Sequence, residues 1–242
     1  MADQEVIKHT KKVYKIWTSK KHSKWDKVKE FVVEVLIIVF AVSLSIWLHE
    51  KSEHSKHNKE VKEFLLGLKQ DLTGDIGEMN EDIKSYKRSA AAYNYIATIK
   101  VGEQPNRDSI QVHRNAFFNQ TKLIPNIGRF EGFKSSGKIG FIEDKELQND
   151  IMDLYQENIP ALSWGADYYN GMKMKLREYC FSVAKRTPGG SGEMFEAALA
   201  TDQAYYWASD LSYTEEIIDR YNECIKKSSK IIDAINKKYD LK

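Results

Sequence analysis

The most prominent feature of the hydrophobic pattern is an apolar run near the N-terminus. Residues 31–48 read FVVEVLIIVFAVSLSIWL, with a single charged residue, Glu34, and two serines. As a helix this run would be about 27 Å long, close to the thickness of the hydrocarbon core of a bilayer. Trp25 and Trp47 flank it, as residues of an interfacial aromatic belt would. We therefore expect residues 31–48 to cross a membrane, and the alternative, favoured by Glu34, is a buried helix of a soluble protein.

Two other kinds of apolar N-terminal segment fit this sequence less well. A cleaved signal peptide has a short basic region, but here the apolar run begins only at residue 31 and continues past a weak cleavage site at 41–43. A pilin-like segment has a glycine before its processing site, where this chain has Lys29 and Glu30. An uncleaved signal anchor is the interpretation that remains.

Beyond this run the pattern changes to that of long amphipathic helices. Residues 50–99 contain no proline, and apolar residues recur there every three or four positions. The stripe consists of Val61, Leu65, Leu68, Leu72, Ile76, Met79, Ile83, Tyr86, Ala90, Tyr93 and Ala97. A second stripe near the C-terminus consists of Ile218, Tyr221, Ile225, Ser228, Ile232, Ile235 and Tyr239. We expect the two helices to pack together, because each stripe would otherwise face water.

Between these helices the sequence predicts shorter elements. We expect helices over 108–120, 144–158, 160–185 and 193–207, irregular structure or short helices over 121–142, and a loop at 187–192. Gly137 is expected to end a short helix with a positive φ, and Asp144 to cap the next one. The predicted fold class is all-α: an N-terminal transmembrane helix continues into a long amphipathic helix, and a helical bundle is closed by a long C-terminal helix.

Composition and charge add an orientation to this picture. The 242 residues include 37 Lys and Arg and 35 Asp and Glu, with 42% hydrophobic residues, which excludes a disordered, collagen-like or disulfide-dense chain. Residues 1–30 contain nine lysines and four acidic residues, and we expect them to form a basic amphipathic segment on the cytoplasmic leaflet. Residues 49–242 would then form a helical domain in the periplasm. Nucleic-acid binding by the basic segment is the weaker alternative, because the chain is tethered to a membrane.

Two stretches carry a resemblance to a known family. Residues 57–72 read HNKEVKEFLLGLKQDL, and residues 129–142 read RFEGFKSSGKIGFI. They resemble an uncharacterised family of single-pass, N-terminally anchored membrane proteins of some Gram-negative bacteria, over roughly residues 30–160. That family shares an acidic residue at the start of its anchor, a helix of the type E-F/Y-L-x-x-L-K-x-D-L and a K-S-S-G-x-L/I element. This chain departs from it at Ala41, where glycine is usual, and at 48–50, where an asparagine-rich exit is usual. The resemblance implies a topology and no activity.

Two groups of polar residues near the apolar run are candidates for chemistry. Glu50, His54 and His57 are spaced four and three residues apart, so they share one face of a helix. Such a set is able to bind zinc or another transition metal, but a solvated juxtamembrane stretch or the polar end of a helix interface has the same pattern. Glu34 is a candidate for a proton or ion path, for a headgroup contact or for a hydrogen bond to a partner helix.

The rest of the chain offers fewer chemical signals. The Lys-Ser-Ser-Gly element at 134–137 lacks the order of a phosphate-binding P-loop. Cys180 and Cys224 can form a disulfide only if their Cα atoms lie within about 7 Å, which the sequence leaves open. Aromatic residues are frequent in the second half, where they either line a ligand pocket or, as we favour, pack in the core. They are Tyr168, Tyr169, Tyr179, Tyr205, Tyr206, Trp207 and Tyr213.

The sequence contains no convergent set of catalytic residues, so we predict a protein that is not an enzyme and has no catalytic, cofactor-binding or metal-binding residues. The expected function is that of an accessory or scaffolding subunit of a cell-envelope complex. Its expected partners are the lipid bilayer and a membrane protein or second copy, contacted through the transmembrane helix and the adjoining stripe. A ligand-binding or sensor domain on the same anchor is the alternative. An envelope enzyme is a third hypothesis, and His113, the only histidine beyond residue 57, argues against it.

Overall fold

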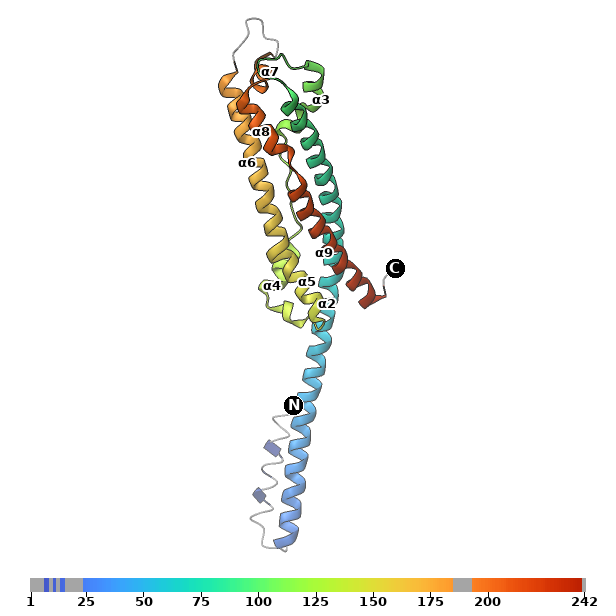
Figure 1. The fold of residues 1–242 in the computed structure, drawn as a ribbon. Helices are drawn as coiled ribbons and strands as arrows, with labels where there is room; N and C mark the ends of the chain where they lie inside the picture. Colours follow the sequence, from blue (N-terminus) through green and yellow to red (C-terminus); the bar gives the residue numbers. More distant parts are fainter. Residues whose placement is uncertain (1–6, 9–10, 12–13, 16–23, 185–192, 241–242) are drawn as a thin grey trace. The chain divides into compact units, whose positions relative to one another are not determined.

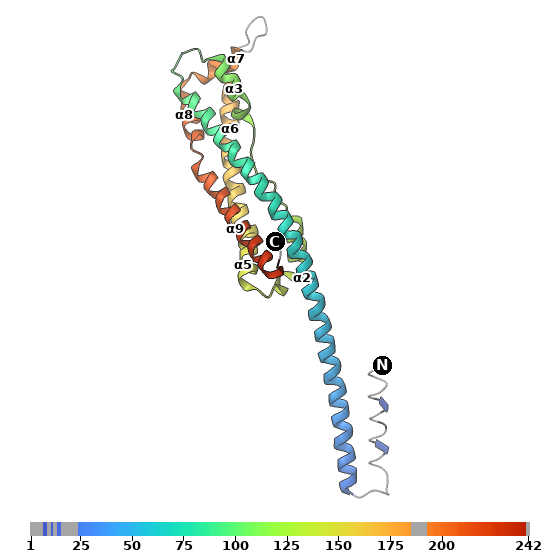
Figure 2. The ribbon, with the colours of Figure 1, turned by 90° about the vertical axis from the view of Figure 1, so that its right-hand side faces the viewer.

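The computed structural model describes residues 7–8, 11, 14–15, 24–184 and 193–240 (Figures 1 and 2). The helical elements of the main chain are α2 (Lys24–Thr98), α3 (Arg107–Phe118), α4 (Gly128–Ser135), the 3-10 helix η1 (Lys138–Phe141), α5 (Lys145–Asp153), the π-helix η2 (Leu154–Asn158), α6 (Ile159–Val183), α7 (Glu193–Leu199), α8 (Asp202–Ser212) and α9 (Glu215–Tyr239). The predicted all-α class is confirmed. Most of the expected basic segment 1–30 and the expected loop 187–192 lie outside the described residues.

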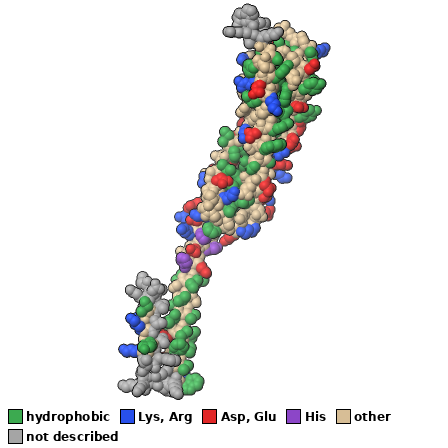
Figure 3. Space-filling model, turned by 90° about the vertical axis from the view of Figure 1, so that its left-hand side faces the viewer, with side chains coloured by type: hydrophobic (Ala, Val, Ile, Leu, Met, Phe, Trp, Pro, Cys, Tyr) green, Lys and Arg blue, Asp and Glu red, His purple; other side chains and the backbone are tan. Residues whose placement is uncertain are grey.

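The chain divides into two compact units, Met1–Lys62 and Glu63–Lys242. The first unit contains the apolar run, which is helical throughout as part of α2. Within 31–48 every residue is exposed except the buried Glu34 and the half-buried Ile38, and Figure 3 shows hydrophobic side chains along the visible part of this helix. Among the described residues, this is the one helix long and apolar enough to cross a membrane. A long apolar N-terminal helix is therefore confirmed, of a kind found in membrane anchors and in signal sequences.

In the second unit, the predicted stripe of α2 forms the centre of the core. Leu65, Leu68, Leu72, Met79, Ile83, Tyr86 and Tyr93 are all buried, as expected. The prediction is wrong at three positions, because Asp75, Ser89 and Ile96 are buried in place of the neighbouring Ile76, Ala90 and Ala97. Two of the three are buried polar residues that form hydrogen bonds with other segments of the chain, and a search for apolar spacing does not find such residues.

The C-terminal helix α9 packs with a stripe displaced from the predicted one. Tyr221, Ser228 and Ile235 are buried as expected, but Ile217, Cys224 and Ile231 are buried where Ile218, Ile225 and Ile232 were predicted. Apolar residues stand at both sets of positions, so spacing alone does not decide which set faces inward.

Three helices meet at a cluster of tyrosine rings in the middle of the second unit. The ring of Tyr86 on α2 lies 5.2 Å from that of Tyr169 on α6 and 5.6 Å from that of Tyr221 on α9, measured between centroids. The helix α6 also packs against α8 and α9. The predicted packing of the long α2 against the C-terminal helix is therefore confirmed (Figures 1 and 2).

The segment before α6 contains a π-helical turn where the sequence has a proline. Asp144 caps α5 as predicted, accepting a hydrogen bond from the backbone N–H of Leu147 at 3.0 Å. The chain then runs through η2 directly into α6, with Pro160 in the first turn of α6. Proline lacks an N–H, and a π turn changes the hydrogen-bond register so that the helical path continues past it.

The predicted helix over 193–207 is wrong as a single element. It is divided into α7 and α8 by a break at Ala200 and Thr201. The Thr201 hydroxyl accepts a hydrogen bond from the backbone N–H of Ala204 at 3.3 Å and so caps α8. Threonine followed by aspartate is a common start of a helix, and this signal outweighs the apolar spacing across the break.

Candidate functional site: a buried polar layer and the groove beside it

The extended segment that joins α3 to α4 lies along the second unit with Thr121 and Leu123 buried and most of its other residues exposed. It pairs with no strand among the described residues, so its buried backbone groups need other hydrogen-bond partners. Thr121 exchanges two bonds with the side chain of Asn170, at 3.3 and 3.0 Å, and its carbonyl oxygen also accepts a bond from the Tyr86 hydroxyl at 2.7 Å. Further along, the N–H of Leu123 donates to the hydroxyl of Tyr221 at 3.2 Å. Side chains of α2, α6 and α9 thus fix the path of this segment.

Two carboxylates of α2 complete this polar layer. Asp75 is buried and accepts bonds from the backbone N–H and the side-chain amide of Asn126, at 3.1 and 2.7 Å. Asp82 accepts a bond from the Tyr221 hydroxyl at 2.8 Å. Burial raises the pKa of both carboxyls, although the hydrogen bonds from Asn126 and Tyr221 act in the opposite direction.

The most unusual residue of the layer is a buried lysine. The side chain of Lys173 on α6 is only 2% exposed, and its Nζ donates to Ser89 Oγ at 3.1 Å and to the carbonyl oxygen of Asn119 at 2.7 Å. The same ammonium lies over the rings of Tyr93 and Tyr169, at 5.9 and 5.5 Å from their centroids. None of these four partners carries a formal charge. Burial lowers the pKa of Lys173 to about 8.

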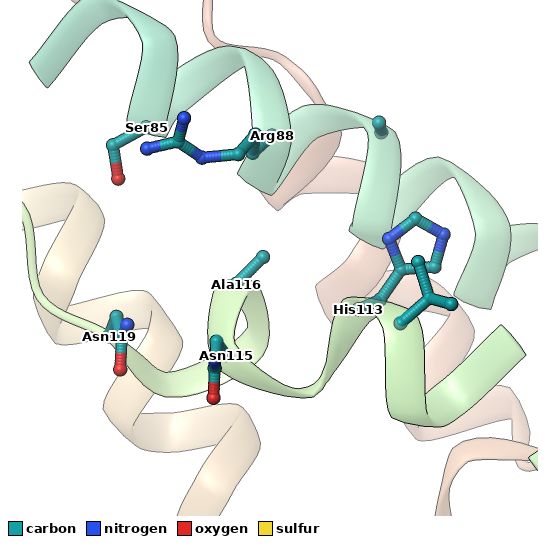
Figure 4. A pocket seen from close by; sticks show the side chains of 8 residues that line it. Ser85, Arg88, His113, Asn115, Ala116 and Asn119 are labelled. Atoms are coloured by element: carbon teal, nitrogen blue, oxygen red, sulfur yellow. The ribbon is translucent and has the colours of Figure 1, made fainter. Parts of the chain in front are cut away.

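A groove of about 510 Å³ lies between α2 and α3, next to the polar layer. Its lining residues are Ser85, Arg88, Ala91, Val112, His113, Asn115, Ala116 and Asn119. In Figure 4, Ser85 and Arg88 project from α2 on one side, Ala116 points towards them from α3, and His113 lies further along. The Asn119 residue connects the groove to the layer, because its carbonyl oxygen is the one bound by Lys173.

The structure locates the predicted histidine and glutamate candidates in the first unit, on α2. His54 Nδ1 lies 3.2 Å from the side-chain amide nitrogen of Asn58, and His49 lies 3.5 Å from Glu53. Across the described ranges, no group of three or more His, Cys, Asp or Glu side chains is arranged to hold a metal ion. The structure therefore does not bring Glu50, His54 and His57 together as a ligand set.

The two cysteines are buried and free, Cys180 on α6 and Cys224 on α9. Burial raises the pKa of each thiol to about 12, so neither forms a reactive thiolate at neutral pH. The glycine of the Lys-Ser-Ser-Gly element, Gly137, has a φ of 73°, which agrees with the predicted left-handed residue at the end of α4.

The predicted aromatic cluster is mostly a surface feature. Tyr169 is buried as expected, but Tyr168, Tyr205, Tyr206 and Tyr213 are exposed, so the expectation of core packing is wrong for these four. They lie outside the lining of the groove. Two other aromatic residues are half-buried: Tyr179 donates a hydrogen bond to Thr201, and Trp207 lies under the ammonium of Lys175.

Sequence reasoning missed the residues that define this region, namely Asp75, Ser89, Asn170 and Lys173. A signal for Lys173 does exist, because it lies four residues after Tyr169 and three before Leu176, on the buried face of α6. A lysine in such a position either extends its ammonium to solvent or donates hydrogen bonds to neutral acceptors inside. The sequence does not decide between these two outcomes.

A family model described as a family of unknown function, DUF6090, matches residues 30–186, about two thirds of the chain. The chain belongs to the DUF6090 family. The DUF6090 match includes the apolar run, α3, the extended segment and α6, and therefore both the buried lysine and the groove. The helices α7, α8 and α9 lie outside it. No curated protein and no solved structure matches this DUF6090 chain.

Proposed function

We propose that the protein is a single-pass, membrane-anchored accessory or scaffolding subunit of a cell-envelope complex and that it is not an enzyme. Residues 31–48 would cross the cytoplasmic membrane, with residues 1–30 in the cytoplasm and the helical second unit in the periplasm. The observation that carries the proposal is the exposure of the apolar side chains of α2 over this run. Leaving apolar surface in water costs about 25 cal/mol per Å², and a lipid environment removes that cost.

The surface of the second unit supports the partner-binding part of the proposal. Trp164 and Tyr168 of α6, here called the α6 aromatic pair, stack with ring centroids 6.0 Å apart and are 66% and 63% exposed. Tryptophan and tyrosine are enriched at the centres of protein interfaces, because they bury a large area with few rotatable bonds. We therefore propose that this pair contributes to binding of the partner.

The apolar stripe of α2 has no part in this contact. Its residues from Leu65 to Tyr93 are covered by the other helices of the same chain, so the surface predicted for docking is already used in the core. The partner is thus proposed to contact the exposed apolar run and the α6 aromatic pair.

The proposal is tested by affinity purification of the tagged full-length chain from native membranes in a mild detergent. The wild-type chain should retain a defined partner or a second copy. The double variant Trp164→Ala, Tyr168→Ala should lose at least half of that material, while Val101→Ala, which truncates a similarly exposed apolar side chain near the end of α2, should retain it. Recovery of the wild-type chain only as a monomer with no co-purifying protein would refute the proposal.

The groove between α2 and α3 favours the alternative, a ligand-binding domain on the same anchor. Its volume of about 510 Å³ lies within the range of small-molecule sites, roughly 300–1,000 Å³.

A further inference from the structure

The polar lining of the groove carries one permanent positive charge, together with groups that both donate and accept hydrogen bonds. Arg88 supplies the guanidinium, and Ser85, Asn115 and Asn119 supply hydroxyl and amide groups. No aspartate or glutamate belongs to this lining. A ligand with acceptor oxygens and a negative charge complements this lining, because it accepts hydrogen bonds from the guanidinium and amide groups.

The guanidinium of Arg88 is accessible to a ligand. Its side chain is exposed, and no ion pair of Arg88 occurs within the described part of the chain. The acidic residue two turns earlier on the same helix, Glu81, lies 2.7 Å from Lys84 and is paired with it. The planar guanidinium matches a carboxylate through two parallel hydrogen bonds.

The remaining part of the groove is lined by small apolar side chains and by the imidazole of His113. Ala91 on α2 and Val112 and Ala116 on α3 contribute small side chains, and the Ala116 methyl group points into the space between the helices (Figure 4). Small side chains here leave room for a flat hydrocarbon or aromatic group next to the charged end.

The wall beside Asn119 is rigid, which favours binding in a preformed site. The buried ammonium of Lys173 holds the carbonyl oxygen of Asn119, and Thr121, two residues later, is fixed by Asn170 and by a 2.7 Å contact with the Ser85 hydroxyl. Groups fixed in this way lose little conformational entropy when a ligand binds.

We infer that the groove between α2 and α3 is a binding site for a small organic acid with one negative charge. Its carboxylate binds Arg88, and its apolar body lies against Ala91, Val112 and Ala116. One negative charge matches the one permanent positive charge of the lining, whereas a phosphate dianion would leave a charge unbalanced. The inference does not depend on the accessory role, because the groove lies entirely within the second unit.

The test is a fluorine NMR titration of the full-length chain in a non-ionic detergent, with 4-fluorobenzoate as the probe. 4-Fluorobenzamide has nearly the same shape without the charge, and micelles without protein serve as the blank. We expect saturable line broadening with 4-fluorobenzoate at millimolar concentrations or below, and none with the amide. Raising the salt concentration should weaken the interaction, because the Arg88 contact is accessible to solvent.

Three substitutions test whether 4-fluorobenzoate binds in the groove. Arg88→Gln should weaken 4-fluorobenzoate binding by about tenfold or more, as expected for loss of a charge-assisted hydrogen bond. Lys87→Gln removes the same charge from the adjacent exposed position outside the lining and should leave binding unchanged. Ala116→Phe should block binding by filling the groove, and thermal unfolding of each variant shows whether it is folded.

Four results would overturn the inference, the first three of which concern the probe and the amide. These three are no saturable binding by the wild-type chain, equal binding by the Arg88→Gln variant, and equal binding of the neutral amide. Inorganic phosphate that displaces the probe more strongly than unlabelled benzoate would also overturn it, because the site would then prefer a dianion.

Discussion

The buried ammonium of Lys173 should make the stability of the fold depend on pH in a defined direction. Burial lowers the pKa of Lys173 to about 8 in the folded chain, whereas the ordinary value is 10.5. Between these values the unfolded chain keeps the proton and the folded chain releases it. The free energy of unfolding therefore rises with pH in this range, because the unfolded state binds more protons. The penalty for the charged form is fully present below pH 8 and is relieved as the pH rises above it.

The variant Lys173→Met isolates this effect, since methionine has a similar volume and no charge. Between pH 7 and 9 the wild-type chain should gain about 1.4 kcal/mol of stability relative to this variant, as calculated from a folded pKa near 8. Cys180 and Cys224 have the opposite effect, because their raised pKa values make the free energy of unfolding fall as the pH rises over the same range. This effect is the same in wild type and variant, so it cancels when the two proteins are compared.

The assay is denaturant unfolding of the full-length chain in detergent, followed by circular dichroism at pH 7, 8 and 9. Lys226→Met, at an exposed position of α9, is the matched control and should follow the wild-type curve. If the difference between wild type and Lys173→Met stays constant over this range, the ammonium is not buried as described.

Three further predictions concern single contacts and are checked by the same unfolding assay. Asp75→Ala should lower the free energy of unfolding by about 1–3 kcal/mol, because it removes the buried carboxylate that accepts the hydrogen bonds of Asn126. Asp75→Asn should cost less, because its side-chain oxygen can still accept one of them. In Gly67→Ala two effects oppose each other. The new methyl group displaces the end of the Arg129 side chain, which is flexible and partly exposed, whereas alanine favours the helix by about 1 kcal/mol relative to glycine. The free energy of unfolding should therefore change by less than about 1 kcal/mol. Burial raises the pKa of Asp150, but hydrogen bonds from two lysines of α9 outweigh this effect, so its pKa lies below the ordinary value. The stability that the ionised carboxylate contributes is therefore lost as the pH falls below about 4. The Asp150→Asn variant should lack this part of the pH dependence.

The sequence predicted the elements of this fold better than their contacts. Apolar spacing was sufficient for the long helices, and the signals at Asp144 and Gly137 were sufficient for two helix ends, because these features are local. Two features of the fold have two locally acceptable forms. Either of two sets of apolar positions on α9 can face inward, and the helix near Thr201 can be continuous or divided; packing with the rest of the core determines which form occurs. Local pattern contains no information on that choice.

The candidate site was not predictable in the same way. It depends on Lys173 and Asn170 of α6 meeting an extended segment some 50 residues earlier in the chain. Polar residues in a core become recognisable only when their partners are known, since the same side chains on a surface need none. Arg88 and Ala116 face each other across the groove because α3 packs beside α2, which no spacing within either helix indicates.

The proposed topology is tested most directly by protease treatment of intact spheroplasts that express the full-length chain with a C-terminal tag. The account predicts that added protease removes the tag while a cytoplasmic marker remains intact, and that carbonate washing leaves the untreated chain in the membrane fraction. A tag that survives in intact spheroplasts and is lost only after lysis, or a chain that carbonate releases into the supernatant, would contradict it.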